Sequence, residues 1–230
     1  MKTLTSAQTV QGFRFPAGTE VQVLNSNGEA TGVVVLHEDH EVDDVWLKRG
    51  TYVTVGSVGG KPPHLSEFSS VPGQRFRGIH LPAETQVDFD VQGRLSEMIS
   101  VRGDPIRIRG KVFAGNTWIE FHPSGGIRRG ELAKGFEASG LHVSPGPIEF
   151  QADGRIKQAC IAAGSVDRKV RLAPSNRSYG FDVEYWPNGH LKQAMLADKI
   201  VLDGKTCPPG HIAFKQDGSL DECDGSPWMH

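Results

Sequence analysis

The sequence predicts an all-β protein in which seven repeats of about 32 residues form an elongated, twisted antiparallel β-meander. Three observations support this prediction. One motif recurs along the whole chain, each copy carries an alternating pair of apolar residues, and Gly-containing turns separate the apolar segments. A closed barrel or a small propeller is the alternative, ranked second because three strands per repeat are too few for four-stranded blades.

The motif is clearest in the segments TVQGFRFPAGTEVQVL (9–24) and RFRGIHLPAETQVDF (75–89). Other copies recur at intervals of 30 to 34 residues, judged from a turn position held by Gly18, Gly50, Glu84, Asn116, Gly146, Gly180 and Gly210. We therefore expect a single repeat domain over 1–230, with repeats at about 8–36, 37–69, 70–101, 102–133, 134–163, 164–197 and 198–230.

Each repeat carries two apolar residues at i and i+2, such as Val21 and Val23 or Ile119 and Phe121, which places both on one face of a strand. A turn ending in Gly follows, for example Asn188-Gly189, because tight hairpins need positive φ at their central positions. Asp44 replaces Gly at one turn, as Asn116 does at another, and both residue types tolerate the left-handed region. The sequence offers no reason for Glu84.

Two segments depart from the repeat. Residues 56–74 are rich in Gly, Ser and Pro and are predicted to form the longest irregular connection. Residues 165–178 replace the expected first segment of the sixth repeat with a basic loop that carries Arg168, Lys169, Arg171 and Arg177. Loops that interrupt a regular scaffold often carry binding residues, although a solvated loop tip is the simpler interpretation.

Composition limits the function classes. A formal charge of -2 gives no basic surface for nucleic acid, and no apolar run is long enough to span a membrane. No signal-peptide pattern precedes the first repeat, so a cytoplasmic location is expected. The odd number of cysteines argues against a disulfide framework, and neither a thiolate zinc motif nor a phosphate-binding glycine motif is present, so no cofactor is predicted.

The segments EYWPNGHLKQAMLA (184–197) and EFHPSGGIRRGELA (120–133) resemble the hairpin of the MORN-variant repeat of bacterial YwqK-type proteins. They share an aromatic residue, a Pro, a Gly-containing turn and a Leu or Ile before an alternating tail. The resemblance implies an elongated antiparallel β-sheet scaffold for protein or lipid contact, with an antitoxin role in some members. It supplies no catalytic residues.

The residue between each apolar pair faces away from the core, and four successive repeats place an acid there: Asp88, Glu120, Glu149 and Glu184. With three strands per repeat, these carboxylates would lie about 14 Å apart, too far to bind one ion. Trp118, His122 and Trp186 flank this column and would form a binding face with it, although an ordinary solvated sheet face is the simpler interpretation.

Two further pairs of residues are candidates for metal binding or catalysis. His37 and His40 lie near carboxylates but are weak metal candidates, because residues three apart on a strand or turn point to different sides. Cys207 and His211 could act as a nucleophile pair, yet Cys207 occupies a position that is apolar in other repeats, which predicts a small core residue.

These observations favour a non-enzymatic scaffold that binds a protein partner through its acidic and aromatic face, in an antitoxin-like or immunity-like setting. A carbohydrate-binding module is the alternative, and it would require Trp118 and Trp186 to be exposed. A hydrolase or metal-dependent enzyme is a further alternative, and it would need residues such as His122 and Asp88 to converge in a pocket.

Overall fold

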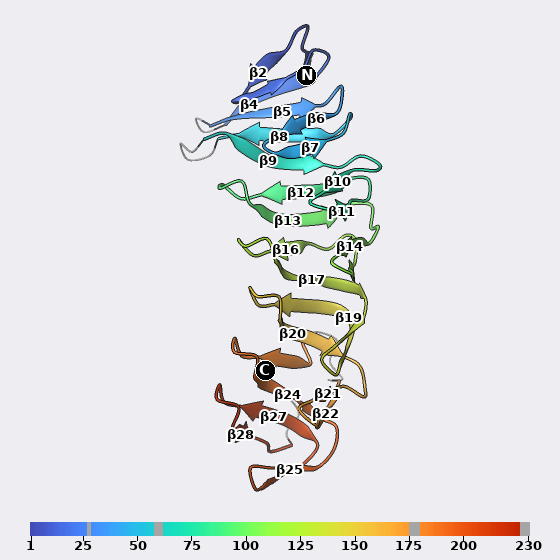
Figure 1. Ribbon diagram of the computed structural model, residues 1–230, viewed down its shortest axis with the longest axis vertical. Helices are drawn as coiled ribbons and strands as arrows, with labels where there is room; N and C mark the ends of the chain where they lie inside the picture. Colours follow the sequence, from blue (N-terminus) through green and yellow to red (C-terminus); the bar gives the residue numbers. More distant parts are fainter. Residues whose placement is uncertain (27–28, 58–61, 175–179, 226–230) are drawn as a thin grey trace. The chain divides into compact units, whose positions relative to one another are not determined.

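A computed structural model describes residues 1–26, 29–57, 62–174 and 180–225. In these residues it contains strands and no helix, which confirms the all-β prediction (Figure 1). The chain divides into two compact units. Unit 1 comprises Met1–Gly110 and Ala114–Gly125, and unit 2 comprises Lys111–Phe113 and Gly126–His230. The prediction of one continuous domain over 1–230 stays a prediction.

Unit 1 contains an antiparallel sheet with the strand order β1-β4-β5-β8-β9-β12-β13-β16 (Figure 1). Strands β1 and β16 pair on one side only among the described residues of this unit, so its sheet is open rather than closed into a barrel. The strands of unit 1 are β1 (Lys2–Thr3), β2 (Gln8–Val10), β3 (Phe13–Phe15), β4 (Glu20–Ser26), β5 (Glu29–Val35), β6 (His40–Val42), β7 (Val45–Leu47), β8 (Tyr52–Gly56), β9 (His64–Ser69), β10 (Arg75–Phe76), β11 (Ile79–His80), β12 (Thr85–Phe89), β13 (Leu95–Ser100), β14 (Ile106–Ile108) and β16 (Ile119–Phe121).

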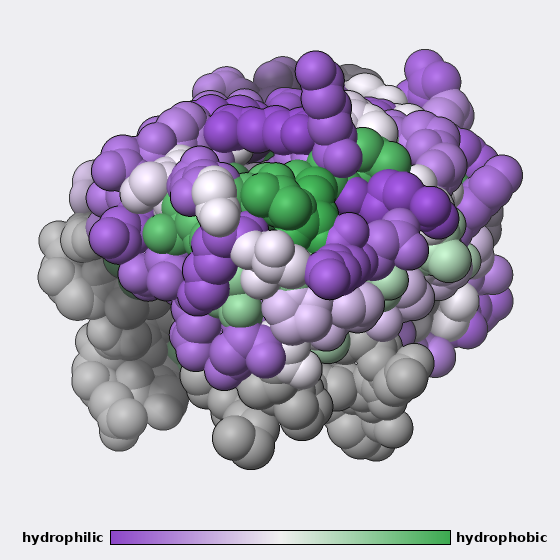
Figure 2. Space-filling view, turned by 90° about the horizontal axis from the view of Figure 1, so that it is seen from below, coloured by the Kyte–Doolittle hydropathy of each residue, from purple (hydrophilic) through white to green (hydrophobic). Residues whose placement is uncertain are grey.

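Unit 2 contains a second run of antiparallel strands in the order β15-β17-β19-β20-β23-β24-β27-β28, with β18 beside β19 and β22 beside β24. Its strands are β15 (Lys111–Phe113), β17 (Ile127–Lys134), β18 (Phe136–Ala138), β19 (Leu141–Phe150), β20 (Ile156–Ile161), β21 (Val166–Asp167), β22 (Val170–Ala173), β23 (Val183–Tyr185), β24 (Leu191–Leu196), β25 (Ile200–Leu202), β26 (Lys205–Cys207), β27 (Gly210–Phe214) and β28 (Leu220–Glu222). The end of this unit that carries β25 faces the viewer in Figure 2, where a few hydrophobic residues lie among hydrophilic ones.

The backbone dihedral angles confirm seven repeats. Each repeat begins with a short hairpin whose two turn residues both have positive φ, and these pairs start at Gln11, Asp43, Arg77, Arg109, Ser139, Arg168 and Asp203. The second predicted turn position also has positive φ in every repeat. This includes Glu84, with φ of 58°, whose carboxylate pairs with the guanidinium of Arg102.

The short hairpins pack on one face of the sheet. Phe76 of β10 lies edge-on against Phe68 of β9 and Phe89 of β12, with ring centroids 5.5 and 5.7 Å apart. Gly32 of β5 leaves space for the β2–β3 hairpin, because a Cβ added at Gly32 would lie 2.8 Å from Cγ1 of Val10. The apolar residues of the strands and hairpins therefore form the core, and the opposite sheet face carries the polar residues.

The number of sheet strands per repeat differs from the prediction. Each repeat has two strands that follow one another in the meander, and its first segment forms a short hairpin. In four repeats this hairpin is a separate two-stranded sheet (β2–β3, β6–β7, β10–β11 and β25–β26), whereas β15, β18 and β22 also pair with meander strands. The predicted separation of about 14 Å between column members is therefore wrong, and about 10 Å, two strand spacings, is expected. Glu97 lies between Asp88 and Glu120 in unit 1, and Gln158 lies between Glu149 and Glu184 in unit 2.

Both segments predicted to be irregular contain strands. Residues 56–74 include β9, which lies in the middle of the unit 1 sheet. Residues 165–173 form the β21–β22 hairpin, so the sixth repeat keeps its first segment. Arg168 and Lys169 are the turn residues of this hairpin, with φ of 45° and 72°.

The chain contains one disulfide, although the odd cysteine count argued against a disulfide framework. Cys207, at the end of β26, is bonded to Cys223, which follows β28, and both side chains are buried. The bond connects the short hairpin of the last repeat to the last sheet strand. Cys160 is the free cysteine.

Candidate functional site

Four carboxylates lie side by side on the polar face of the unit 1 sheet. Glu67 of β9 pairs in register with Asp88 of β12, which pairs on its other side with Glu97 of β13. Glu97 in turn pairs with Glu120 of β16. Directly opposed residues have Cβ atoms about 5 Å apart, so these like charges are close neighbours. We refer to Glu67, Asp88, Glu97 and Glu120 as the acidic ladder.

The first three members of the ladder have no cationic partner within the described residues. The amide nitrogen of Gln86 donates to the two carboxylate oxygens of Asp88 at 3.1 and 3.2 Å. Partial burial raises the pKa of Glu67, and the neighbouring charge of Asp88 raises it further. Partial burial also raises the pKa of Asp88, which its bond from Gln86 partly opposes.

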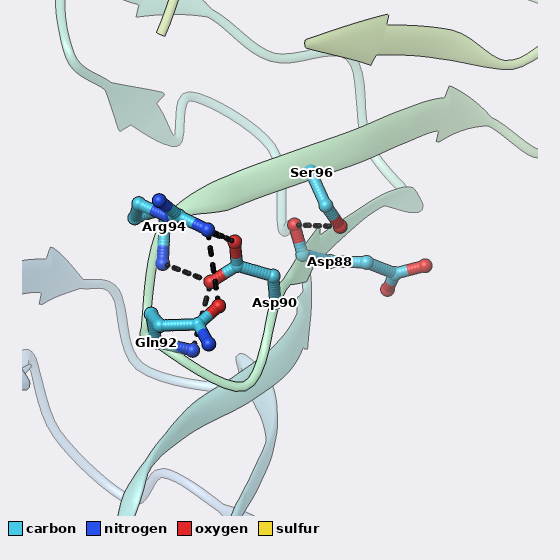
Figure 3. A network of polar contacts seen from close by, with 5 residues as sticks. All are labelled: Asp88, Asp90, Gln92, Arg94 and Ser96. Atoms are coloured by element: carbon cyan, nitrogen blue, oxygen red, sulfur yellow. Dashed lines mark hydrogen bonds and ion pairs between the residues drawn. The ribbon is translucent and has the colours of Figure 1, made fainter. Parts of the chain in front are cut away.

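The hairpin turn beside the ladder contains a separate network (Figure 3). Asp90 accepts hydrogen bonds from the backbone N–H groups of Gln92 and Arg94, and forms an ion pair with the Arg94 guanidinium at 2.7 Å. The carboxylate of Asp88 points away from this network. Arg94 therefore neutralises Asp90 in the turn and does not neutralise Glu67, Asp88 or Glu97.

The corresponding row of unit 2 is neutralised. Glu149 forms an ion pair with Lys157 at 2.8 Å, and Glu184 forms one with Lys192 at 2.9 Å. Gln193 also donates to Glu184 at 2.6 Å. These two members of the predicted acidic column therefore have partners of opposite charge in their own hairpins.

A local sequence difference explains this contrast. The second sheet strand of the hairpin reads Leu-Ser-Glu at 65–67 and 95–97, but Ile-Lys-Gln at 156–158 and Leu-Lys-Gln at 191–193. In the two Lys-Gln segments, the lysine at the second position forms a hydrogen bond with the carboxylate on the preceding strand. The residue at the third position lies in the same row across the strands as the acids. A Ser-Glu pair thus removes one positive charge and adds one negative charge relative to Lys-Gln.

The predicted aromatic residues have different environments. Trp118 directly precedes β16 and is 40% exposed, whereas His122 follows that strand and is half-buried. Trp186 follows β23, and its indole N–H donates to the carbonyl of Phe214 at 2.9 Å while Lys192 lies over its ring. Trp186 therefore has a role within the fold of unit 2.

The two histidines proposed as weak metal ligands contact other groups. Nε2 of His40 lies 2.7 Å from the carbonyl oxygen of Arg14, and its ring packs near Phe15. The ring of His37 lies against Gly18, where an added Cβ would be 2.7 Å from its Cδ2. The described residues contain no group of three or more His, Cys, Asp or Glu side chains arranged to hold a metal ion.

The predicted basic loop is a hairpin with one ion pair. Arg171 of β22 pairs with Asp198 at 3.1 Å, while Arg168 and Lys169 are turn residues. Arg177 lies outside the described residues. The disulfide of Cys207 also leaves no thiol for the pair considered with His211.

Glu67 and Glu97 are the functional candidates that the sequence analysis missed. Alternation along the first strand of a hairpin, β12 or β16, identified Asp88 and Glu120. The residues of the second strands, β9 and β13, were not recognised as lying beside these acids on the polar face. The Leu-Ser-Glu segments were the available signal, because Glu two residues after a buried Leu across a bulge faces the polar side.

Comparison with protein-family models, curated proteins and solved structures finds no match to this chain. The resemblance to MORN-variant repeats therefore stays a prediction. The described residues contain no helix capable of spanning a membrane.

Proposed function

We propose that the chain is a non-enzymatic repeat scaffold that binds a basic protein segment along the acidic ladder. The observation that supports this proposal is the run of adjacent carboxylates, of which Glu67, Asp88 and Glu97 contact no cation among the described residues. Unit 2 provides an internal comparison, since its corresponding acids already have lysine partners.

Electrostatics gives the reason for a basic partner. Like charges opposite one another destabilise a sheet, and the raised pKa values of Glu67 and Asp88 reflect the unfavourable surroundings of the charged forms. A Lys or Arg side chain placed between two members would relieve this repulsion and form charge-assisted hydrogen bonds. A basic segment crossing the strands would meet one carboxylate about every 5 Å.

The test is capture of partners from a lysate of the cells that produce the protein. The wild type is compared with the ladder variant Glu67→Gln/Asp88→Asn/Glu97→Gln and with the control variant Glu149→Gln/Glu184→Gln. We expect a basic protein that wild type and control retain, that the ladder variant loses, and that increasing salt releases.

Equal retention of every captured protein by the ladder variant and the wild type would contradict the proposal. Loss of the partner in the control variant alone would also contradict it. Both variants should be checked for cooperative unfolding, so that a loss of binding is not confused with a loss of folding.

A further inference from the structure

Unit 1 contains an open groove of about 810 Å³ away from the carboxylates of the ladder. It lies between the β6–β7 hairpin, the β10–β11 hairpin, the segment before β9 and the turn between β12 and β13. Ligand sites of this size are common in proteins. Its lining includes Asp43, Asp44, Trp46, Arg75, Phe76 and Arg77.

Trp46 is the most exposed tryptophan among the described residues, with 60% of its surface accessible. It lies on β7 between the buried residues Val45 and Leu47, so its ring is on the outer side of the hairpin. The fold does not need an indole at this position for its core. An exposed indole beside a groove offers a flat apolar surface to a ligand.

The backbone around this groove is held firmly. The buried side chain of Gln74 donates to the carbonyls of Trp46 and Arg75 at 2.9 and 2.8 Å, and accepts from the N–H of Lys48 at 2.9 Å. One amide thus fixes two lining residues relative to each other. The carboxylate of Asp43 accepts from the N–H of Leu65 at 2.9 Å, which attaches the β6–β7 turn to β9.

The floor of the groove is also ordered by packing. Phe76 is buried against Phe68 and Phe89, and the guanidinium of Arg77 lies 5.2 Å from the centre of its ring. Side chains held in this way lose little conformational entropy when a ligand binds.

The charged side chains that line the groove favour a neutral ligand over a charged one. Asp43 and Asp44 carry two negative charges, and Arg75 and Arg77 carry two positive charges, so the formal charges cancel. Carboxylates accept and guanidinium groups donate hydrogen bonds, which matches the hydroxyl groups of a neutral sugar. An anionic ligand would be repelled by the two aspartates, and a cationic ligand would be repelled by the two arginines.

We infer that this groove binds a neutral saccharide, with a sugar ring stacked on Trp46 and its hydroxyl groups bonded by Asp44 and Arg75. This site differs from the Trp118 and Trp186 surface considered from the sequence, and it does not depend on the proposed partner of the ladder. Both saccharide sites would require an apolar aromatic ring face with polar groups at its edge.

The test is isothermal titration calorimetry of the full chain with cellohexaose, maltohexaose, chitohexaose and, as the anionic probe, hexagalacturonate. We expect one neutral hexasaccharide to bind, and Trp46→Ala to weaken that binding at least about tenfold. Trp118→Ala is the matched control, because Trp118 is also exposed in unit 1 but does not line the groove, and it should bind as the wild type does.

Asp44→Asn is the second variant, since Asn tolerates the left-handed backbone at this turn, where φ is 61°. It should weaken binding without unfolding the hairpin. No binding of any probe at about 10 mM, stronger binding of hexagalacturonate, or unchanged binding by Trp46→Ala would overturn the inference. The ladder variant should bind the saccharide normally, which separates this site from the proposed function.

Discussion

Glu67 lies directly opposite Asp88 across the β9–β12 pair, and neither carboxylate contacts a cation among the described residues. Such a pair normally costs folding free energy, because like charges on facing strands repel. The repeats of unit 2 show that this chain can place a lysine beside the equivalent acid. The pair is therefore a sequence feature that folding alone does not require.

Neutralising Glu67 should stabilise the protein at neutral pH. The pKa of Glu67 is raised, so across the window between its unfolded and folded pKa values the folded chain binds more protons than the unfolded chain. Stability therefore falls as the pH rises through this window. Glu67→Gln removes the repulsion and should raise the free energy of unfolding by about 0.5 kcal/mol at pH 7.

Urea unfolding of the wild type and Glu67→Gln at a series of pH values checks this expectation. The difference should shrink as the pH falls below the window, because the wild-type carboxyl is then protonated in both states. Glu184→Gln is the control and should give no gain, since it removes bonds from Lys192 and Gln193. A constant difference at every pH would contradict the electrostatic explanation.

Lys169→Gly should stabilise the β21–β22 hairpin. Lys169 has φ of 72°, at the position where five of the six other repeats have Gly. The left-handed conformation costs an L-residue roughly 1–2 kcal/mol, and the greater flexibility of Gly when unfolded offsets about half of that, so a net gain of about 0.5 kcal/mol is expected.

Urea unfolding measures this gain, with Asp44→Gly as the control at the equivalent turn. Asp tolerates positive φ better than Lys does, so Asp44→Gly should gain less. Equal gains for the two variants would mean that side-chain tolerance of the left-handed region does not decide the stability of these turns.

Breaking the disulfide should destabilise the last repeat. Cys207 and Cys223 are 16 residues apart, and closing a loop of that size stabilises a fold by about 3 kcal/mol. Cys207→Ala/Cys223→Ala should therefore unfold at lower temperature than the wild type, while Cys160→Ala changes the melting temperature less. Reductant should lower the melting temperature of the wild type and leave that of the double variant unchanged.

The thiol of Cys160 should react slowly with alkylating reagents. Burial is the main cause that raises its pKa to about 11, and the charge of Asp182 contributes. Because the thiolate is the reactive form, alkylation by iodoacetamide at pH 8 should be on the order of 100-fold slower than for an unperturbed cysteine. Reaction at the rate of a small thiol, measured by mass spectrometry, would contradict this.

The sequence predicted the repeat and its turn chemistry because those depend on local backbone sterics. Gly12, Asp44 and Asn116 all have the positive φ expected from their positions. The three-strand repeat was wrong because a short hairpin and a sheet strand have the same period-2 alternation. Whether a strand joins the main sheet depends on which face its neighbours bury, and alternation does not show that.

The candidate site was predicted in part. Asp88 and Glu120 were identified from one strand of each hairpin, whereas Glu67 and Glu97 depend on the register across strands and on the bulge that precedes them. The lysine partners of Glu149 and Glu184 depend on the same geometry. The disulfide was missed because an odd cysteine count does not show which two cysteines the fold brings together.

The ladder as a binding surface is tested most directly by titrating the protein with a synthetic Arg-Ser repeat peptide and following the backbone amides by NMR. We expect shifts centred on β9, β12 and β13, salt-sensitive binding, and a clear loss of affinity in Glu67→Gln/Asp88→Asn/Glu97→Gln. Binding that is unchanged in this variant, or that is lost instead in Glu149→Gln/Glu184→Gln, would show that the ladder is not the binding surface.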